Sequence, residues 1–357
     1  MRADTRRHFM GRRIGALAIA VTLAMTMTAC AARGDPPARG STQTPAHLQG
    51  WHEDDLAGLR QALDAQCGLS RRPAGWAQHC DDLRGIPQGA QNALRAWVEQ
   101  RFNARPLGGD TGVTGLITGY HEPELPGSRT RTARFTVPLL RALGAEHPLA
   151  RATRATIESA ATLTTQAIAW VEDPVDAFFL QVQGSGRIRL ADGSVIRLGY
   201  AANNGHAYLA IGSVLVARGA LVAGQVDAPA IKAWLRAHPA EGAQVMRQNP
   251  RYIFFRELPP APADRGPPGS LGAPLTALRS IAVDPSKVSP GALLWLDTTD
   301  PLERRPLRRL VLAQDTGAAI VGEVRADLFW GTGARAEQAA GLMKAPGRLW
   351  LLEPAAR

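Results

Sequence analysis

Two aspartates near the C-terminus of this 357-residue chain have the surroundings of a reactive carboxyl group. Asp315 and Asp327 each lie near the end of an apolar run that a glycine turn follows, and Phe329 and Trp330 flank the second aspartate. Aromatic surface excludes water from a neighbouring carboxyl and raises its pKa, which suits a group that protonates a sugar oxygen. Solvated aspartates at sheet edges far outnumber catalytic ones, so these residues alone do not decide between the two interpretations.

A third aspartate, Asp284, directly precedes a proline, and this pattern favours turn initiation. For Asp315, a turn at the end of its strand and a functional role are equally compatible with the sequence. Alternation along 324–330 places Asp327 and Phe329 on one face of a predicted strand.

Motifs for other kinds of chemistry are missing from the sequence. The Gly184-Ser185-Gly186 turn lacks the third glycine and the following helix of a nucleotide-binding loop. His206 has no second histidine or cysteine at metal-ligand spacing, and no serine occupies a G-x-S-x-G turn. We therefore expect neither a metal ion nor a cofactor.

The hydrophobic periodicity predicts opening helices and then mainly strands from about residue 112 onward. Helices are expected at 51–67 and 87–102, from about 153, and at 207–217 and 228–238. Strands are expected at 112–120, 135–140, 177–183, 187–190, 194–198, 277–283, 292–296, 307–313, 318–321, 324–329 and 348–352. Asp192-Gly193 marks a tight hairpin. Many short strands between Gly and Pro turns are typical of a barrel or sandwich.

The first 29 residues have the organisation of an export signal. Five arginines precede the uncharged apolar run 14–28, and Cys30 follows it after small residues. The run is shorter than the about 20 apolar residues of a membrane span. The cysteine favours a lipoprotein signal, with Cys30 as the acylated first residue, over an ordinary cleaved signal. Residues 5–10 fit a twin-arginine signal and a generic basic head equally well.

Charge and cysteine content narrow the class of protein. Residues 1–29 carry five arginines and one aspartate, so +6 of the formal net charge of +10 remains on the mature chain. The arginines are scattered and lysine is nearly absent, which argues against a nucleic-acid partner. Cys67 and Cys80 are equally compatible with a disulfide and with free thiols. Residues 30–49 have the composition of a flexible tether, and the remainder is long enough for two domains.

Five segments resemble, in the same order, motifs of the membrane-bound lytic murein transglycosylase A (MltA) family. The run 314–333, which contains Asp315 and Asp327, resembles the C-terminal three-aspartate (3D) domain of that family. The other segments are TGYHEP at 118–123, DAFFLQVQGSG at 176–186, GYAANNGHAY at 199–208 and QNPRYIFF at 248–255. His121, Asn203 and Arg251 replace the Tyr, Lys and Ser that are frequent in the family, and none of these departures removes a carboxylate.

The resemblance implies a mainly β fold with helices, in which a double-psi β-barrel carries a smaller inserted β domain and a glycan groove lies between them. The implied segments are a signal peptide (1–29), the tether (30–49), the first part of the barrel (50–120), the insert (121–255) and the 3D domain (256–357). The implied activity is that of a peptidoglycan lytic exotransglycosylase. It cleaves the β-1,4 bond between N-acetylmuramic acid and N-acetylglucosamine and forms a 1,6-anhydro product.

On this template Asp327 is the catalytic acid and base, and Asp315 and Asp284 are supporting residues. One carboxyl suffices because the muramyl C6 hydroxyl is an intramolecular nucleophile. The implied substrate contacts are Thr118, Tyr120, Gln183, Gly184, Ser185, Tyr200 and Asn204. Phe178, Phe179, Phe254 and Phe255 are expected in the core.

The family consists of outer-membrane lipoproteins, so the resemblance implies a periplasmic enzyme anchored through Cys30, and Ala31 suits outer-membrane sorting. The expected partners are peptidoglycan glycan strands and cell-wall synthase complexes. Two hypotheses compete with this one: a non-catalytic protein that binds or loosens the wall, and a hydrolytic muramidase whose products would have reducing ends.

Overall fold

The computed structural model describes residues 41–109 and 113–355. The predicted signal peptide and Cys30 lie outside these residues, as does the first part of the predicted tether. In the remaining part of that tether, Gln43 exchanges backbone hydrogen bonds with Ala104, and Leu48 is buried. This segment contains a short 3-10 helix, η1 (Pro45–His47).

Short helices form the first layer of the protein. They are η2 (Trp51–Glu53), α1 (Leu59–Cys67), α2 (Trp76–Arg84) and α3 (Gln91–Arg101). The predicted helix 51–67 is interrupted because the backbone takes positive φ angles at Leu56 and Gly58. The prediction for 87–102 corresponds to α3, and α2 was not predicted. The buried faces of these helices share one hydrophobic core with Trp295 and Leu312 of the barrel.

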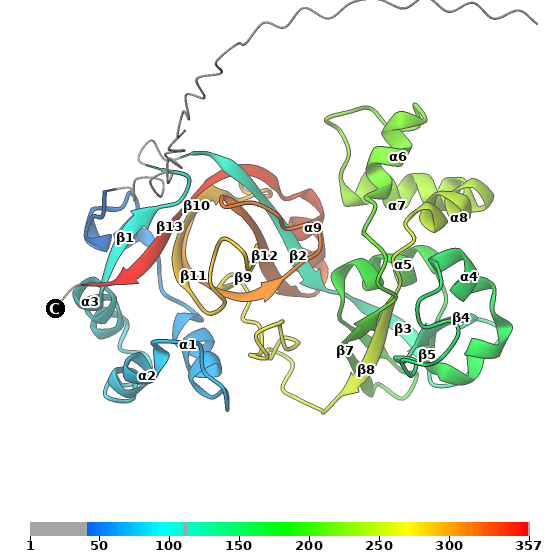
Figure 1. Ribbon diagram of the computed structural model, residues 1–357, viewed down its shortest axis with the longest axis horizontal. Coiled ribbons are helices and arrows are strands. Elements are labelled where there is room, and N and C mark those ends of the chain that lie inside the picture. The colour runs from blue at the N-terminus through cyan, green and yellow to red at the C-terminus, as the bar shows by residue number, and fades with distance from the viewer. Residues whose placement is uncertain (1–40, 110–112, 356–357) are drawn as a thin grey trace, which may run out of the picture. The chain divides into compact units, whose positions relative to one another are not determined.

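Six strands close into a barrel (Figure 1). They are β2 (Gly115–Glu122), β9 (Ser280–Val283), β10 (Leu293–Thr299), β11 (Pro306–Thr316), β12 (Arg325–Thr332) and β13 (Lys344–Pro354). The order is β13-β10-β11-β9-β12-β2, and the first residues of β13 pair with β2 to close the ring. The pairs β9–β11 and β2–β12 are parallel, and the others are antiparallel. Outside the ring, β1 (Phe102–Pro106) pairs with β13.

Alternation along the strands separates the barrel interior from its outer face. Ile117, Ile281, Ala326 and Leu328 are fully buried in one core cluster, which helix α9 (Ala334–Leu342) joins through Ala336 and Ala339. Residues between these interior positions, among them Thr118 and Asp327, therefore point outward. The closed barrel with a separate sheet confirms the predicted fold class.

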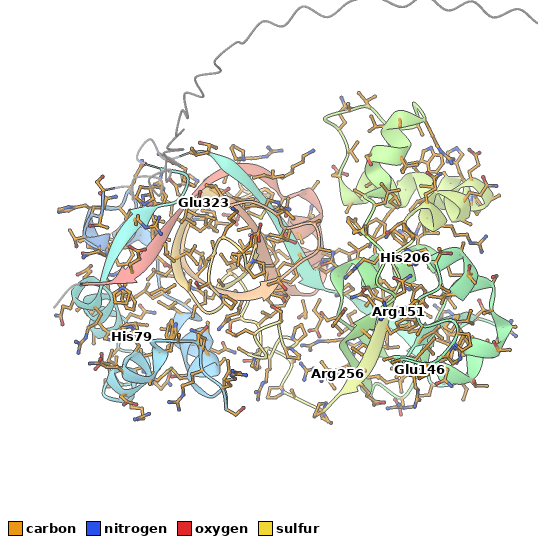
Figure 2. All side chains as sticks on the ribbon, in the orientation of Figure 1. His79, Glu146, Arg151, His206, Arg256 and Glu323 are labelled. Carbon is orange, nitrogen blue, oxygen red and sulfur yellow. A yellow bond between two sulfur atoms is a disulfide. The ribbon has the colours of Figure 1, made fainter. Side chains whose placement is uncertain are left out.

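The second sheet has the order β4-β5-β3-β6-β7-β8. Its strands are β3 (Glu124–Ser128), β4 (Val137–Leu140), β5 (Ala167–Val171), β6 (Gly186–Arg189), β7 (Val195–Asn203) and β8 (Ile253–Leu258). Around it lie α4 (Arg154–Ser159), η3 (Ala161–Gln166), α5 (Pro174–Gln183), α6 (Ile211–Ala217), α7 (Ala228–Ala237) and α8 (Pro239–Gln248). The β6–β7 pair confirms the predicted hairpin. Figure 2 labels Arg256 on β8 and also His206, whose ring Nε2 lies 3.0 Å from the carbonyl oxygen of Arg151.

Buried charged side chains link the segment that leaves the barrel for the insert to the segment that returns from it. Glu122 ends β2, and its Oε2 accepts a 2.8 Å hydrogen bond from Nε of Arg187 on β6. Arg187 and Arg197 both donate to the carbonyl oxygen of Arg265, in the segment that leads back to the barrel. These contacts hold the outgoing and returning chains together.

Two strand predictions are wrong. Residues 177–183 belong to helix α5, whose Asp173 side chain caps the N-terminus and whose C-cap, Gly184, has a φ of 80°. Apolar residues on two sides of α5 pack into two different cores, so the sequence shows no single apolar face at helical spacing. Residues 318–321 form a turn instead of a strand. Of the four phenylalanines expected in the core, Phe178, Phe254 and Phe255 are buried and Phe179 is half-buried.

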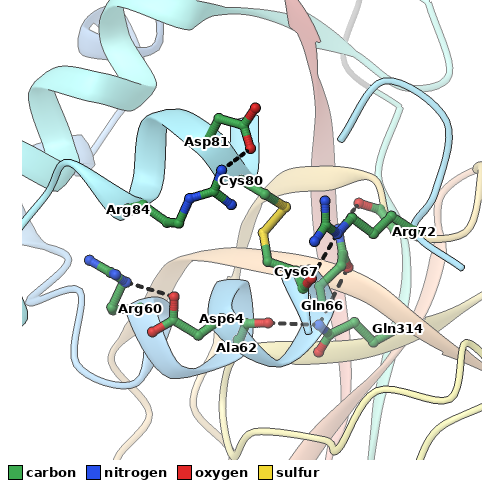
Figure 3. Close-up of a disulfide and its surroundings, with 11 residues drawn as sticks. Arg60, Ala62, Asp64, Gln66, Cys67, Arg72, Cys80, Asp81, Arg84 and Gln314 are labelled. Atoms are coloured by element: carbon green, nitrogen blue, oxygen red, sulfur yellow. Dashed lines mark hydrogen bonds and ion pairs between the residues drawn. A yellow bond between two sulfur atoms is a disulfide. The ribbon is translucent and has the colours of Figure 1, made fainter. Parts of the chain in front are cut away.

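Helices α1 and α2 are joined by a disulfide between Cys67 and Cys80 (Figure 3). Nearby, Nε2 of Gln314 on β11 donates to the carbonyl oxygen of Ala62 at 3.0 Å. The alternatives that the sequence left open for the two cysteines are thereby resolved in favour of the bridge.

Candidate active site

Asp327 occupies the middle of β12, which pairs in parallel with β2 on one side and antiparallel with β9 on the other. Its register partners are Ala282 on β9 and Thr118 on β2. The Thr118 hydroxyl donates a 2.6 Å hydrogen bond to Oδ1 of Asp327. The carboxyl lies on the outer face of the barrel, where it lines a cavity.

Burial raises the pKa of Asp327 from its ordinary value of 3.8 to about 6. The hydrogen bond from Thr118 and the charge of Arg325 lower the pKa, and the nearby Asp315 raises it, but desolvation dominates. A carboxyl with this pKa retains a proton on about one molecule in ten at neutral pH. It is therefore able both to donate a proton and to accept one.

The predicted aromatic surroundings of Asp327 are correct for one ring only. Phe329 is on the same face of β12, and its ring centroid lies 5.2 Å from that of Tyr120. Trp330 belongs to the core of the barrel, where its indole nitrogen contacts the sulfur of Met343.

A β-bulge in β11 places Asp315 on the same face of the barrel as Asp327. The register of β11 against β9 shifts between Ala313 and Asp315, so Asp315 pairs with Ala282, as Asp327 does from the other side. Without the extra residue, alternation would direct Asp315 into the barrel with Ala313. The two aspartates are thus two strands apart on one face, about 10 Å between Cα atoms.

Asp315 is held by three hydrogen bonds. Tyr120 donates its hydroxyl to Oδ2 at 3.0 Å, and the backbone N–H groups of Ser270 and Thr316 donate to Oδ1. Burial raises the pKa of Asp315 in spite of these donors. Burial, followed by the charges of both aspartates, also raises the pKa of Tyr120, so Tyr120 stays a hydrogen-bond donor.

Asp284 organises a loop and does not line the cavity. It accepts hydrogen bonds from the backbone and hydroxyl of Ser286, as the predicted turn requires, and from the N–H of Gly322 at 2.8 Å. The Ser286 hydroxyl, with Gly322, lowers the pKa of Asp284. The loop that Gly322 ends includes Gly317 to Ile320, and these residues line the cavity.

The cavity in front of the two aspartates has a volume of about 940 Å³ and is lined by both barrel and insert. Four of the predicted contact residues on the insert line it: Gln183, Gly184, Ser185 and Tyr200. Tyr120 lines it from the barrel, while Thr118 contacts Asp327 from the neighbouring strand. Oε1 of Gln183 accepts a hydrogen bond from the backbone N–H of His121, which joins the two walls.

Asn204 lies outside the lining of this cavity. Its side chain is buried, and its amide donates to the carbonyl oxygens of Ala152 and Pro250 and accepts from the N–H of Tyr252. Every polar atom of the side chain is thus engaged with the backbone. The structure does not bring Asn204 to the other predicted contact residues, and its predicted glycan contact stays a prediction.

Several lining residues were not predicted. Arg251 and Arg256 line the cavity from the insert, and the Pro267–Ser270 loop borders Asp315. A Cβ atom at Gly269 would lie 2.4 Å from the carbonyl oxygen of Gln314, so this loop approaches β11 too closely for another residue. The dense Gly and Pro content of the loop is a signal for such an approach. Within 41–109 and 113–355, no group of three metal-ligating side chains is placed to hold an ion.

Family models match two segments of the chain. One, described as the MltA specific insert domain, matches residues 144–256, and the other, described as the 3D domain, matches residues 279–353. The chain is also 31% identical over 291 residues to membrane-bound lytic murein transglycosylase A of Escherichia coli K12. This alignment covers 76% of this chain and 78% of that protein.

Solved structures resemble most of this chain. Lytic transglycosylase LtgG of Burkholderia pseudomallei is 42% identical, with a TM-score of 0.63 over 90% of this chain and 97% of that one. Escherichia coli MltA with bound chitohexaose is 28% identical, with a TM-score of 0.73 over 85% of this chain and 91% of that one.

Proposed function

Because the chain belongs to the family of membrane-bound lytic murein transglycosylase A, we propose that it is a lytic transglycosylase of peptidoglycan. It cleaves the β-1,4 bond between N-acetylmuramic acid and N-acetylglucosamine and leaves a 1,6-anhydro ring on the muramyl product. The observation that carries the proposal is the position of Asp327, which lines the cavity and whose pKa is raised by desolvation to about 6.

Asp327 performs both proton transfers in this proposal. The protonated carboxyl gives its proton to O4 of the N-acetylglucosamine that leaves, and the bond from C1 of the muramyl sugar to O4 breaks. The C6 hydroxyl of the same sugar attacks C1, and its proton returns to Asp327. No water is consumed, and because the nucleophile is part of the substrate, its orientation supplies much of the rate gain.

The neighbouring groups tune and position Asp327. Thr118 acts through Asp327 as a positioning residue, because its hydrogen bond fixes one carboxylate oxygen. Asp315 supports the protonated form of Asp327 by its charge, and Tyr120 in turn fixes Asp315. Asp284 supports the site through the loop that Gly322 ends.

The insert supplies the polar wall that binds glycan. Gln183, Gly184 and Ser185 end helix α5 at the cavity, where amide and hydroxyl groups are suited to N-acetyl and hydroxyl groups of a sugar. Tyr200 exposes 46% of its surface there, and an aromatic face of this kind packs on sugar rings. A relative of this fold is solved with bound chitohexaose, an oligosaccharide of N-acetylglucosamine.

Location and mode of cleavage are further parts of the proposal. No helix within the described residues is long and apolar enough to cross a membrane, and the relative from Escherichia coli K12 is called membrane-bound. We propose that acylated Cys30 anchors the enzyme to the outer membrane on its periplasmic side. Cell-wall synthase complexes are its proposed partners. The proposed mode of cleavage starts from the ends of glycan strands. We also retain the predicted domain limits at residues 50, 121 and 256. Mass spectrometry of the mature N-terminus tests the anchor, and the time course of fragment lengths tests the mode.

The activity is tested with purified sacculi. The wild-type chain should release 1,6-anhydro-muropeptides, and Asp327→Asn should release them about 10²- to 10⁴-fold more slowly, the usual contribution of a general acid and base. Products with reducing ends would identify a hydrolytic muramidase. Binding to sacculi without any release of soluble products would identify a non-catalytic wall protein.

A further inference from the structure

A second cavity lies beside the first and is chemically different. It has a volume of about 540 Å³ and is lined by α5, α6, the segment before α7, α7 itself and the first residue of β13. Most of its lining is aliphatic or aromatic, including Phe179, Ile211, Val226 and Ile231. Such a lining offers few hydrogen bonds to a sugar but suits small apolar side chains.

The two cavities adjoin. Val182 and Tyr208 line both of them, so a ligand in the glycan cavity reaches the second one without crossing the body of the protein. Val182 exposes 39% of its surface although it is aliphatic.

One cation borders the second cavity. The sequence holds three lysines, Lys232, Lys287 and Lys344, among 41 basic residues. Lys232 is engaged by Asp176 and Glu337. Lys344 lines the cavity and is exposed, and its ammonium group has no hydrogen bond or ion pair with any residue of 41–109 or 113–355.

Lys344 also belongs to the row of residues that contains the reactive carboxyl. Asp327 pairs with Thr118 across β12 and β2, and Thr118 pairs with Lys344 across β2 and β13. Cross-strand partners project from the same face, so Lys344 is two strands from Asp327, about 10 Å between Cα atoms. An extended peptide covers this distance in about three residues.

We propose that the second cavity binds the peptide branch of the muramyl sugar, with its small apolar side chains on the aliphatic lining and a carboxylate on Lys344. The proposal rests on the proposed function, because it places the muramyl sugar beside Asp327. The lactyl group of that sugar carries a peptide with alanine methyl groups and several carboxylates. An apolar cavity with one unpaired cation at its edge is complementary to that combination.

The kinetic test compares two substrates: sacculi with intact peptides, and glycan from the same sacculi after an amidase has removed the peptides. Lys344→Gln should lower kcat/KM on the peptide-bearing substrate by up to about fivefold, the upper end of the range of a solvent-exposed ion pair. It should leave the rate on the peptide-free glycan unchanged. The matched control is Lys287→Gln, an exposed lysine that lines neither cavity.

A second variant tests the apolar part of the cavity. Ala223 is an exposed lining residue of the connecting segment before α7, so Ala223→Trp fills the entrance without disturbing a core. It should produce the same selective loss on the peptide-bearing substrate. Equal losses on both substrates, or no loss in either variant, would overturn the peptide site while leaving the proposed function intact. Failure of the wild-type chain to form anhydro products from both substrates would contradict the proposed function itself.

Binding is measured separately from activity. Reductive ¹³C-methylation labels the three lysines, and the soluble tetrapeptide released by the amidase is added to the mature chain. The resonance of Lys344 should shift in a saturable manner while that of Lys287 stays in place, and Ala223→Trp should abolish the shift. A Lys344 resonance that responds to protein concentration but not to the peptide would show instead that a second copy of the chain covers the cavity.

Discussion

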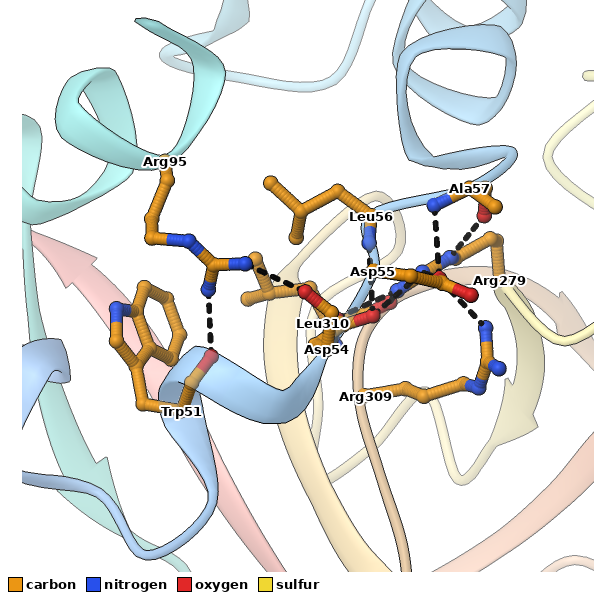
Figure 4. A network of polar contacts seen from close by, with 9 residues as sticks. All are labelled: Trp51, Asp54, Asp55, Leu56, Ala57, Arg95, Arg279, Arg309 and Leu310. Carbon is orange, nitrogen blue, oxygen red and sulfur yellow. Dashed lines mark hydrogen bonds and ion pairs between the residues drawn. The ribbon is translucent and has the colours of Figure 1, made fainter. Parts of the chain in front are cut away.

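Two desolvated aspartates, Asp54 in the segment after η2 and Asp327 on β12 of the barrel, have opposite acid–base behaviour. Asp54 is 3% exposed and receives both terminal nitrogens of Arg279, at 2.6 and 2.7 Å, together with the N–H groups of Leu56 and Leu310 (Figure 4). Burial raises the pKa of Asp54, but these donors and the charge of Arg279 outweigh it, so the pKa lies below its ordinary value. For Asp327, with one hydroxyl donor, burial prevails.

The difference shows that burial alone does not make a carboxyl reactive. At the N-terminal helices the chain surrounds its aspartate with donors, and the result is a permanently charged anchor between η2, β11 and the segment before β9. Arg95 extends this anchor by donating to the carbonyl oxygens of Trp51 and Asp54. At the cavity Asp327 receives one hydrogen bond, from the Thr118 hydroxyl, so its carboxyl is able to exchange a proton near neutral pH.

Removal of Arg279 should have the largest effect on stability. Arg279→Ala leaves Asp54 buried without its counter-ion, which should cost about 3–5 kcal/mol of the free energy of unfolding. The specific activity of the molecules that remain folded should be unchanged, because the network lies away from the cavity. Denaturant unfolding of the variant measures the loss.

The double variant Asp54→Asn/Arg279→Met is the control for that experiment. It removes both charges and keeps an acceptor for the N–H groups of Leu56 and Leu310, so it should recover part of the lost stability. Equal destabilisation of the single and double variants would mean that the packing of Arg279, and not its charge, holds the anchor.

The disulfide should stabilise the region of the N-terminal helices, which also contains the Asp54 anchor, and should not affect the cavity. Cys67 and Cys80 are 13 residues apart, and opening a loop of this size should lower the free energy of unfolding by about 3 kcal/mol. The variant Cys67→Ala/Cys80→Ala tests this by thermal unfolding, with the release of anhydro products at low temperature as the control. A loss of activity without a loss of stability would place the bridge in the function of the cavity.

Replacement of Asp327 should have the opposite effect on stability. Its pKa in the folded chain is about 6, so the folded state holds a proton that the unfolded state releases between about pH 4 and pH 6. The wild-type chain therefore loses stability as the pH rises through this window. Asp327→Asn has no such dependence and should be more stable than the wild type above pH 6, by up to about 3 kcal/mol.

Measurements of stability against pH distinguish the two aspartates. The advantage of Asp327→Asn should vanish near pH 4, where both states of the wild type are protonated. The contribution of Asp54 behaves in the reverse sense: its pKa is depressed, so its stabilisation is present above the ordinary pKa and is lost as the pH falls through the folded pKa. A constant difference between Asp327→Asn and the wild type from pH 4 to pH 8 would mean that the pKa of Asp327 is not raised.

The sequence predicted Asp327 itself but neither the anchor around Asp54 nor the orientation of Asp315. Strand alternation around Asp327 was sufficient to put that residue on the outer face of the barrel, because Ala326 and Leu328 alternate with it in the core. The orientation of Asp315 was not predictable in this way, because it depends on a β-bulge that exists only when β11 pairs with β9. Helix α5 was missed although Asp173-Pro174 and Gly184 marked both of its ends.

Long-range placement explains the remaining omissions. Lys344 and Arg256 are isolated basic residues in the sequence, and nothing near them indicates a cavity. Lys344 is brought close to Thr118 by the closure of the barrel, 226 positions away along the chain. The lining of the first cavity combines the insert with segments before and after it, and the lining of the second combines the insert with Lys344 of β13, so local patterns do not identify these residues.

The smallest expected effect is also the most direct probe of Asp327. The rate of anhydro-product release should fall as the pH rises through about 6, because the acid must be protonated. Thr118→Val removes the one hydroxyl that lowers the pKa of Asp327, and the loss of a hydrogen bond to a charged group should move this fall upward by up to about one pH unit. Thr118→Ser keeps the hydroxyl and should leave the profile in place. A profile that stays in place in Thr118→Val, or moves to lower pH, would mean that a group other than Asp327 controls the rate.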